Sequence, residues 1–164
     1  MADLRTELDR VLTRFGKKAV GTMISNLRKS GVKGTNGQGS RLERSLVFQV
    51  KKGKNIGISI FANDYWEYVE DGRGSGKMPP ISNILRYVKT RNLDVSKIKG
   101  KNYEAKAKSL AFVIARAIGK KGTIKRLGYK GTKFVEKSIT DELLNDMVEG
   151  IEVALLNDIE NRFK

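Results

Sequence analysis

The chain has 164 residues, of which 39% are hydrophobic and 31% are charged, and its formal net charge is +15; these values predict one soluble globular domain over residues 1–164. It contains no cysteine and no histidine, which excludes disulfides, thiolate metal sites and the usual general base at neutral pH. No apolar run reaches the roughly 18 residues of a membrane span, and the charged start of the chain lacks the apolar core of a signal peptide, so we expect a cytoplasmic protein without membrane contact.

A long helix is predicted at the start of the chain. From residue 3 to residue 30, apolar side chains recur at steps of three and four, which places them on one face of a helix about 40 Å long. Gly31 is placed to end it. Gly16 and Gly21 within the helix each cost about 1 kcal/mol relative to alanine. Packing must therefore stabilise this helix, which needs a partner along its length.

A β-hairpin is predicted after a polar linker. Residues 31–40 are rich in glycine and predict a mobile loop. The apolar period then changes to two, because Leu46, Phe48 and Val50 alternate with polar residues, and isoleucines alternate over 56–60. Residues 52–55, Lys-Gly-Lys-Asn, form the turn. A lone hairpin is marginal in water, so its apolar face is expected to pack on helices or further strands.

Residues 62–72 predict one or two helical turns in which the aromatic side chains Tyr65, Trp66 and Tyr68 pack inward. A second mobile loop is expected over 71–80. Three helices follow: one begins at Pro79 or Pro80 and ends near residue 92, one spans 107–118, and one runs from about residue 140 to residue 159. A third mobile loop is expected over 119–133. The elements together predict an α+β fold, with a long N-terminal helix, an antiparallel hairpin or small sheet, and three further helices packed on it.

Two features suggest chemistry, and neither fits well. Gly-Ser-Gly-Lys77 is similar to the end of a phosphate-binding loop, but Asp71 stands at the first glycine position and Met78 replaces the required Ser or Thr. The carboxylates at 64, 67, 70 and 71 form a cluster in which a nuclease could hold Mg²⁺. A solvated helix face, with Glu70 or Asp71 paired to Arg73 or Lys77, is the more ordinary interpretation. We therefore predict no catalytic residue, no metal site and no cofactor.

The charge is divided unevenly along the chain. Residues 139–164 hold seven acids and two bases, a net charge of −5, so the remainder carries +20. Residues 75–138 hold seventeen Lys or Arg and three acids. Such a field favours a polyanion, although few aromatic residues are interleaved for base stacking and no DNA-reading motif is present. A basic body and an acidic segment also suit head-to-tail contacts between identical subunits.

Several short motifs carry a family resemblance. SRLERSL (40–46) leads into the hairpin, residues 62–72 end in Tyr-Val-Glu-Asp-Gly, residues 110–123 form an alanine-rich segment with Arg-x-Ile-x-x-x-Gly, and Lys-Gly-Thr-Lys-Phe134 precedes the last helix. In this order they resemble the small tail-completion or neck proteins of long-tailed bacteriophages, a family that includes minor tail components. Trp66 replaces the usual small residue, and Lys133 replaces a proline, so the loop around Phe134 is expected to differ in shape.

The resemblance implies an α+β structural protein of the virion, without enzymatic activity, in a ring of six or twelve copies at the head-tail junction. Its partners would be copies of itself, other neck, connector and tail proteins and, transiently, the genomic DNA that passes through the ring. The alternative is a basic protein that binds nucleic acid independently of sequence. We expect the loop over 71–80 to face a partner, with protein-interface residues Glu70, Arg73, Lys77, Pro79 and Phe134, and DNA-facing residues Lys51, Lys52 and Lys54.

Overall fold

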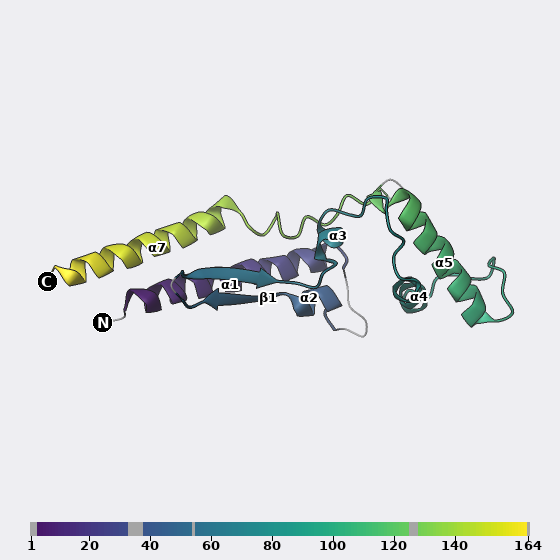
Figure 1. Cartoon of the computed structure of the whole chain (residues 1–164), viewed down its shortest axis with the longest axis horizontal. Coiled ribbons are helices and arrows are strands. Elements are labelled where there is room, and N and C mark those ends of the chain that lie inside the picture. Colours follow the sequence, from purple (N-terminus) through teal and green to yellow (C-terminus); the bar gives the residue numbers. More distant parts are fainter. Residues whose placement is uncertain (1–2, 33–37, 54, 125–127, 164) are drawn as a thin grey trace. The chain divides into compact units, whose positions relative to one another are not determined.

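The computed structural model describes residues 3–32, 38–53, 55–124 and 128–163. The chain forms two compact units, a terminal unit of Met1–Trp66 with Thr132–Lys164 and a middle unit of Glu67–Gly131. The predicted α+β class is confirmed, because helices are combined with a two-stranded antiparallel sheet (Figure 1). One domain over 1–164 stays a prediction.

The terminal unit is built around one long helix that contacts both the hairpin and a second long helix. Its two long helices come from opposite ends of the described chain and run side by side (Figure 1). Its elements are α1 (Leu4–Lys29), α2 (Arg41–Ser45), β1 (Val47–Lys51), β2 (Gly57–Phe61) and α7 (Asp141–Arg162).

Helix α1 confirms the predicted long helix to within one residue at each end. Its buried stripe has the expected spacing of three and four residues and consists of Val11, Leu12, Phe15, Gly16, Ala19, Met23 and Leu27. Gly16 has a packing role that composition alone did not predict. A Cβ at this position would overlap the ring of Phe48 and lie 2.7 Å from Ile58 Cδ1, so the missing side chain allows the hairpin to approach the helix closely.

The hairpin forms as predicted, with one inward apolar face. Val50 opposes Ile58 and Phe48 opposes Ile60 across the antiparallel pair, and all four side chains are partly buried. Directly opposed residues point to the same side of a sheet, which places this apolar set against α1. The outer pair, Val47 and Phe61, is exposed.

Helix α2 was not predicted, although its N-terminal signal is present in the sequence. Ser40 and Glu43 form a capping box: Ser40 Oγ accepts from the Glu43 N–H at 3.1 Å, and the Ser40 N–H donates to Glu43 Oε2 at 3.2 Å. The other carboxylate oxygen accepts from Arg28 Nε at 2.7 Å. This bond from Arg28 holds the pKa of the buried Glu43 carboxyl below its ordinary value against the opposing effect of burial. The network ties α2 to the end of α1.

A connection over residues 132–140, with turns at 134–138, leads into α7. Phe134 is fully buried at 0% exposure, and Ser138 Oγ, which donates to the Phe134 carbonyl at 2.5 Å, accepts from Asn26 of α1 at 2.9 Å. Lys133 has φ 55°, a value that a proline ring, fixed near −65°, cannot adopt. Thr140 caps the N-terminus of α7, because its Oγ1 accepts from the Leu143 N–H at 3.3 Å.

The middle unit is a helix pair with its own core. It contains most of α3 (Trp66–Glu70), with α4 (Ile81–Thr90) and α5 (Tyr103–Lys121). Val88 of α4 and Val95 pack against Ala107 and Ala111 of α5, and partly buried Ile and Leu side chains surround them. Alanines on this face let the two helices approach closely. The inward packing predicted for the aromatic residues of 62–72 is wrong for Tyr65 and Tyr68, which are exposed.

Candidate interaction surfaces

The described residues contain no group of three or more Asp or Glu side chains able to hold a metal ion. The acidic cluster predicted over 64–71 does not converge, because Glu70 is buried whereas Asp64, Glu67 and Asp71 are exposed. In the part of the chain that the structure covers, no helix is both long enough and apolar enough to cross a membrane.

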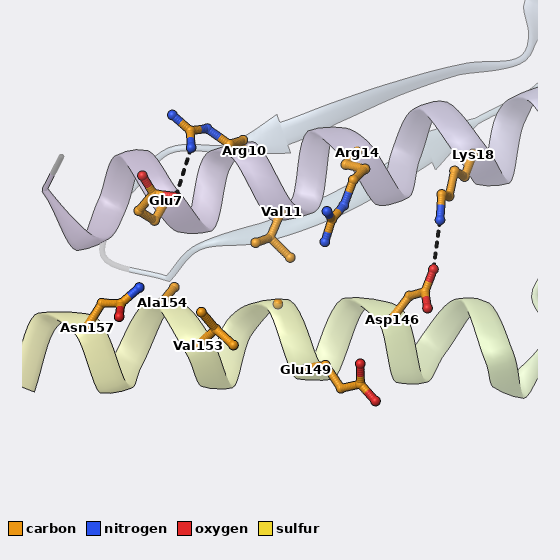
Figure 2. Close-up of a pocket in the computed structure, with 11 residues that line it drawn as sticks. Glu7, Arg10, Val11, Arg14, Lys18, Asp146, Glu149, Val153, Ala154 and Asn157 are labelled. Atoms are coloured by element: carbon orange, nitrogen blue, oxygen red, sulfur yellow. Dashed lines mark hydrogen bonds and ion pairs between the residues drawn. The ribbon is translucent and has the colours of Figure 1, made fainter.

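A groove of the terminal unit lies between α1 and α7 and has a volume of about 460 Å³ (Figure 2). A basic row on α1 faces acids on α7, and Lys18 Nζ lies 2.7 Å from Asp146 Oδ2. The hydrogen bond from Lys18, then the charges of Lys18 and Arg14, keep the pKa of Asp146 below its ordinary value. Figure 2 shows Arg14 reaching from α1 into the space between the helices. The groove is lined by Glu7, Arg10, Val11, Arg14, Lys18, Asp146, Glu149, Gly150, Val153, Ala154 and Asn157.

The floor of this groove is a close helix-helix contact. A Cβ at Gly150 would lie 3.0 Å from Val11 Cγ1 and 3.2 Å from Arg14 Nη2, and Ala154 one turn later is buried. Small residues on α7 thus let it lie close to α1, while paired charges line the rim. The arrangement joins two helices of one unit.

The outer face of α7 is apolar and unpartnered within its own unit. Ala154 is the only buried residue of the helix. The side chain of Leu156 is 59% exposed, and acidic Glu152 and Glu160 lie one turn before and after it. We refer to the exposed apolar residues of α7 and these two acids as the α7 outer face. Its apolar members are Val148, Leu155, Leu156, Ile159 and, at the edge that adjoins the groove against α1, Val153.

The outer face of α5 is also apolar, but its charge is opposite. A depression of about 260 Å³ lies over Ala117. Val113 and Lys121 bound it one turn before and one turn after Ala117. Its side is formed by the neighbouring row of Phe112, Arg116 and Lys120. Val113 is 52% exposed and Phe112 44%. The only acid of α5, Glu104, is paired with Lys89 at 2.7 Å. We refer to the six residues that line the depression as the α5 outer face.

The loop over 71–80 is held against the end of α5 within the middle unit. The Arg73 N–H donates to Thr123 Oγ1 at 2.9 Å, the Thr123 N–H donates to the Arg73 carbonyl at 2.8 Å, and the Gly76 N–H donates to the Gly119 carbonyl at 2.8 Å. The Arg73 guanidinium donates to the Lys77 carbonyl and lies 5.0 Å from the ring centre of Tyr68. Backbone pairing thus joins two loops that were predicted to be separate and mobile.

Tight backbone packing closes the same region from the other side. Gly131 has φ 83°, and a Cβ there would overlap the Glu70 carbonyl, so only glycine fits. Tyr129 Oη donates to the Val69 carbonyl at 2.9 Å. Burial first, and the charge of Glu70 second, raise the pKa of the Tyr129 phenol. Residues 125–127 of the loop predicted over 119–133, and 33–37 of the loop predicted over 31–40, lie outside the described residues.

The predicted interface residues divide into interior and surface positions. Glu70, at 6% exposure, Pro79 and Phe134 are buried. The chain itself covers these three side chains in this conformation, and their role at a protein interface stays a prediction. Arg73 is half-buried and Lys77 is exposed, so these two remain accessible.

Two of the predicted DNA-facing lysines, Lys51 and Lys52, lie at the tip of the hairpin. Lys51 is exposed at the end of β1. Lys52 Nζ lies 3.3 Å from Asp9 Oδ2 of α1, which offsets part of its charge. Lys54 lies outside the described residues.

The two outer faces were missed by sequence reasoning, although one signal was available. Residues 139–159 contain more apolar side chains than a single buried stripe requires, because Val148, Leu155 and Leu156 fall beside the stripe that faces α1. Comparisons with protein-family models, curated proteins and solved structures found no match. The function is therefore inferred from these surfaces and from the sequence motifs.

Proposed function

We propose that this protein is a structural subunit of a tailed-bacteriophage virion, part of the ring assembly at the head-tail junction, and that it acts through contacts with neighbouring proteins. The observation that carries the proposal is the presence of two exposed apolar helix faces of opposite charge on one small chain, the outer faces of α5 and α7. The family resemblance of the sequence motifs supplies the phage setting.

A ring requires such an asymmetric subunit. Each copy in a cyclic assembly contacts its two neighbours through two different patches, and soluble monomers seldom leave large apolar patches uncovered. The charge distribution supports this role, since residues 139–164 carry −5 while the middle unit, with sixteen bases and five acids, carries +11. Bases that face the channel would contact the passing genome weakly.

The proposal is tested on purified protein and on particles. Size-exclusion chromatography with light scattering and negative-stain microscopy should show rings, either alone or with the purified neck partners. Labelled antibody should mark the junction of head and tail in native virions, and loss of the gene should leave heads and tails unjoined. Labelling elsewhere on the particle, or intact infectious virions without the protein, would contradict the proposal.

A second candidate function is sequence-independent binding of nucleic acid by the isolated protein. The +11 charge of the middle unit favours it. Tight binding of duplex DNA by monomers, with affinity that falls steeply as salt is raised, would support this function. Weak binding together with ring formation would leave the structural role as the better account.

A further inference from the structure

We propose that the α7 outer face of one copy docks on the α5 outer face of the next copy, with Leu156 seated in the depression over Ala117. This inference deepens the proposed function and rests on it, because it names the two surfaces through which identical subunits would assemble. The occupant of each face is a second copy of this chain.

The α5 outer face has the shape of an acceptor. Ala117 is small, and larger side chains surround it: Val113 and Lys121 one turn away along the helix, and Arg116 and Lys120 in the neighbouring row. A side chain from another helix can enter such a gap, as ridges enter grooves in helix packing. The depression has an apolar end at Phe112 and Val113 and a basic end at Lys120 and Lys121.

The α7 outer face has the matching protrusion. Leu156 is the most exposed of the large apolar side chains between Asp141 and Arg162. Its neighbours at a spacing of three residues are the exposed Val153 and Ile159, and its neighbours at a spacing of four are the acids Glu152 and Glu160. An apolar side chain framed by carboxylates therefore meets an apolar depression framed by bases.

Charge selects this pairing over the symmetric ones. Two α7 outer faces placed together would oppose Glu152 and Glu160 to the same acids, and two α5 outer faces would oppose Arg116 and Lys120 to the same bases; like charges at an interface are strongly unfavourable. The heterologous pairing brings opposite charges together. Because each copy then uses a different face toward each neighbour, the contact propagates into a ring or a filament and does not stop at a dimer.

The absence of cysteine from the chain allows a direct test. Ala117→Cys and Leu156→Cys each introduce a single thiol at an exposed or shallow position. Under mild oxidation, a mixture of the two variants, one of them enlarged by a tag, should give a covalent heterodimer, whereas each variant alone should give little dimer. The matched control mixes Leu156→Cys with Ser82→Cys, which places the thiol at an exposed position on α4. This mixture should give no heterodimer.

The double variant A117C/L156C extends the test to assembly. Heterologous docking predicts a ladder of covalent oligomers that ends at the copy number of the ring. Products limited to monomer mass would overturn the inference, and so would Leu156→Cys dimers that form alone as efficiently as the mixture. No heterodimer above the Ser82→Cys control, at the highest soluble concentration and with the neck partners added, would overturn it too.

Charge exchange separates docking from general electrostatics. Arg116→Glu with Lys120→Glu should weaken self-association on the order of tenfold or more, since like charges then face each other. A second variant carries Glu152→Lys with Glu160→Lys. Mixing the two purified variants should restore association between them. Lys97→Glu with Lys99→Glu, two exposed bases outside both faces, changes the net charge equally and should have little effect.

The outcomes distinguish this inference from the proposed function. Rings or junction labelling that survive the Arg116 and Lys120 reversal would leave the structural role standing and reject the docking surfaces. Self-association lost equally in the Lys97 and Lys99 control would also reject them, because the effect would then follow net charge. Absence of the protein from the junction would reject the structural role itself.

Discussion

Gly16 and Gly21 provide a matched pair of substitutions within α1. Both glycines lie in the helix interior, so replacement by alanine should gain about 1 kcal/mol of helix propensity at each. A Cβ at Gly21 would meet no atom within 4 Å. At Gly16 the same atom would overlap Phe48 and lie 2.7 Å from Ile58 Cδ1.

The geometry sets the size of the expected difference. Carbon atoms in contact prefer roughly 3.5–4.0 Å, so the hairpin would have to move by about 1 Å to admit the methyl group at Gly16. Overpacking of this kind costs about 1–3 kcal/mol. Gly21→Ala should therefore stabilise the protein by about 1 kcal/mol, while Gly16→Ala should be less stable than Gly21→Ala by about 1–3 kcal/mol, because propensity cancels between the two.

Urea unfolding followed by far-UV circular dichroism measures this difference. The midpoints of the two variants are compared at equal slope, since an unchanged slope indicates that the surface exposed on unfolding is unchanged. Equal midpoints for Gly16→Ala and Gly21→Ala would refute the inference that the hairpin packs directly on α1 at Gly16.

Three further predictions follow from local geometry. Gly131→Ala should destabilise the middle unit severely, because a methyl group would overlap the Glu70 carbonyl at φ 83°; hydrogen exchange should show lost protection in Glu67–Gly131, with native protection there contradicting the reasoning. Glu43→Gln should cost about 1–2 kcal/mol near neutral pH. The pKa of Glu43 is lowered in the folded protein. Its contribution to stability is therefore present above the ordinary carboxyl pKa and is lost as pH falls through the lowered value. The urea midpoints of wild type and variant should then converge in acid, and a constant gap would argue against the ionised pair with Arg28. Thr140→Ala should cost about 1 kcal/mol through loss of the α7 cap, whereas Thr140→Ser should retain most of the stability.

Helix α1 and the hairpin were predictable because each has a regular apolar period. Helix α1 and the strands bury the residues that the periods of 3.6 and 2 assign to one face. The capping box at Ser40 marked α2, but a five-residue helix leaves no period to detect. Apolar spacing over two to three turns likewise predicted α4 and α5.

Burial of single aromatic and loop residues was less predictable. Tyr65 and Tyr68 lie in a segment too short for its apolar face to be defined by spacing, and Phe134 lies in a turn with no period at all. Their environments depend on segments distant in sequence: Ser138, which bonds to the Phe134 carbonyl, is fixed by Asn26. The candidate faces on α5 and α7 were hidden for a similar reason, because exposure depends on which helix pairs with which.

The joint between α1 and α7 connects residues far apart in the chain, with a sequence separation of 128 between Lys18 and Asp146. During synthesis, the ribosome therefore releases α1 and the entire middle unit before the partner of α1 exists. The α7-facing side of α1 is exposed to solvent for that interval, and we expect the basic row of Arg10, Arg14 and Lys18 to keep that side hydrated. Once α7 is complete, Lys18 pairs with Asp146.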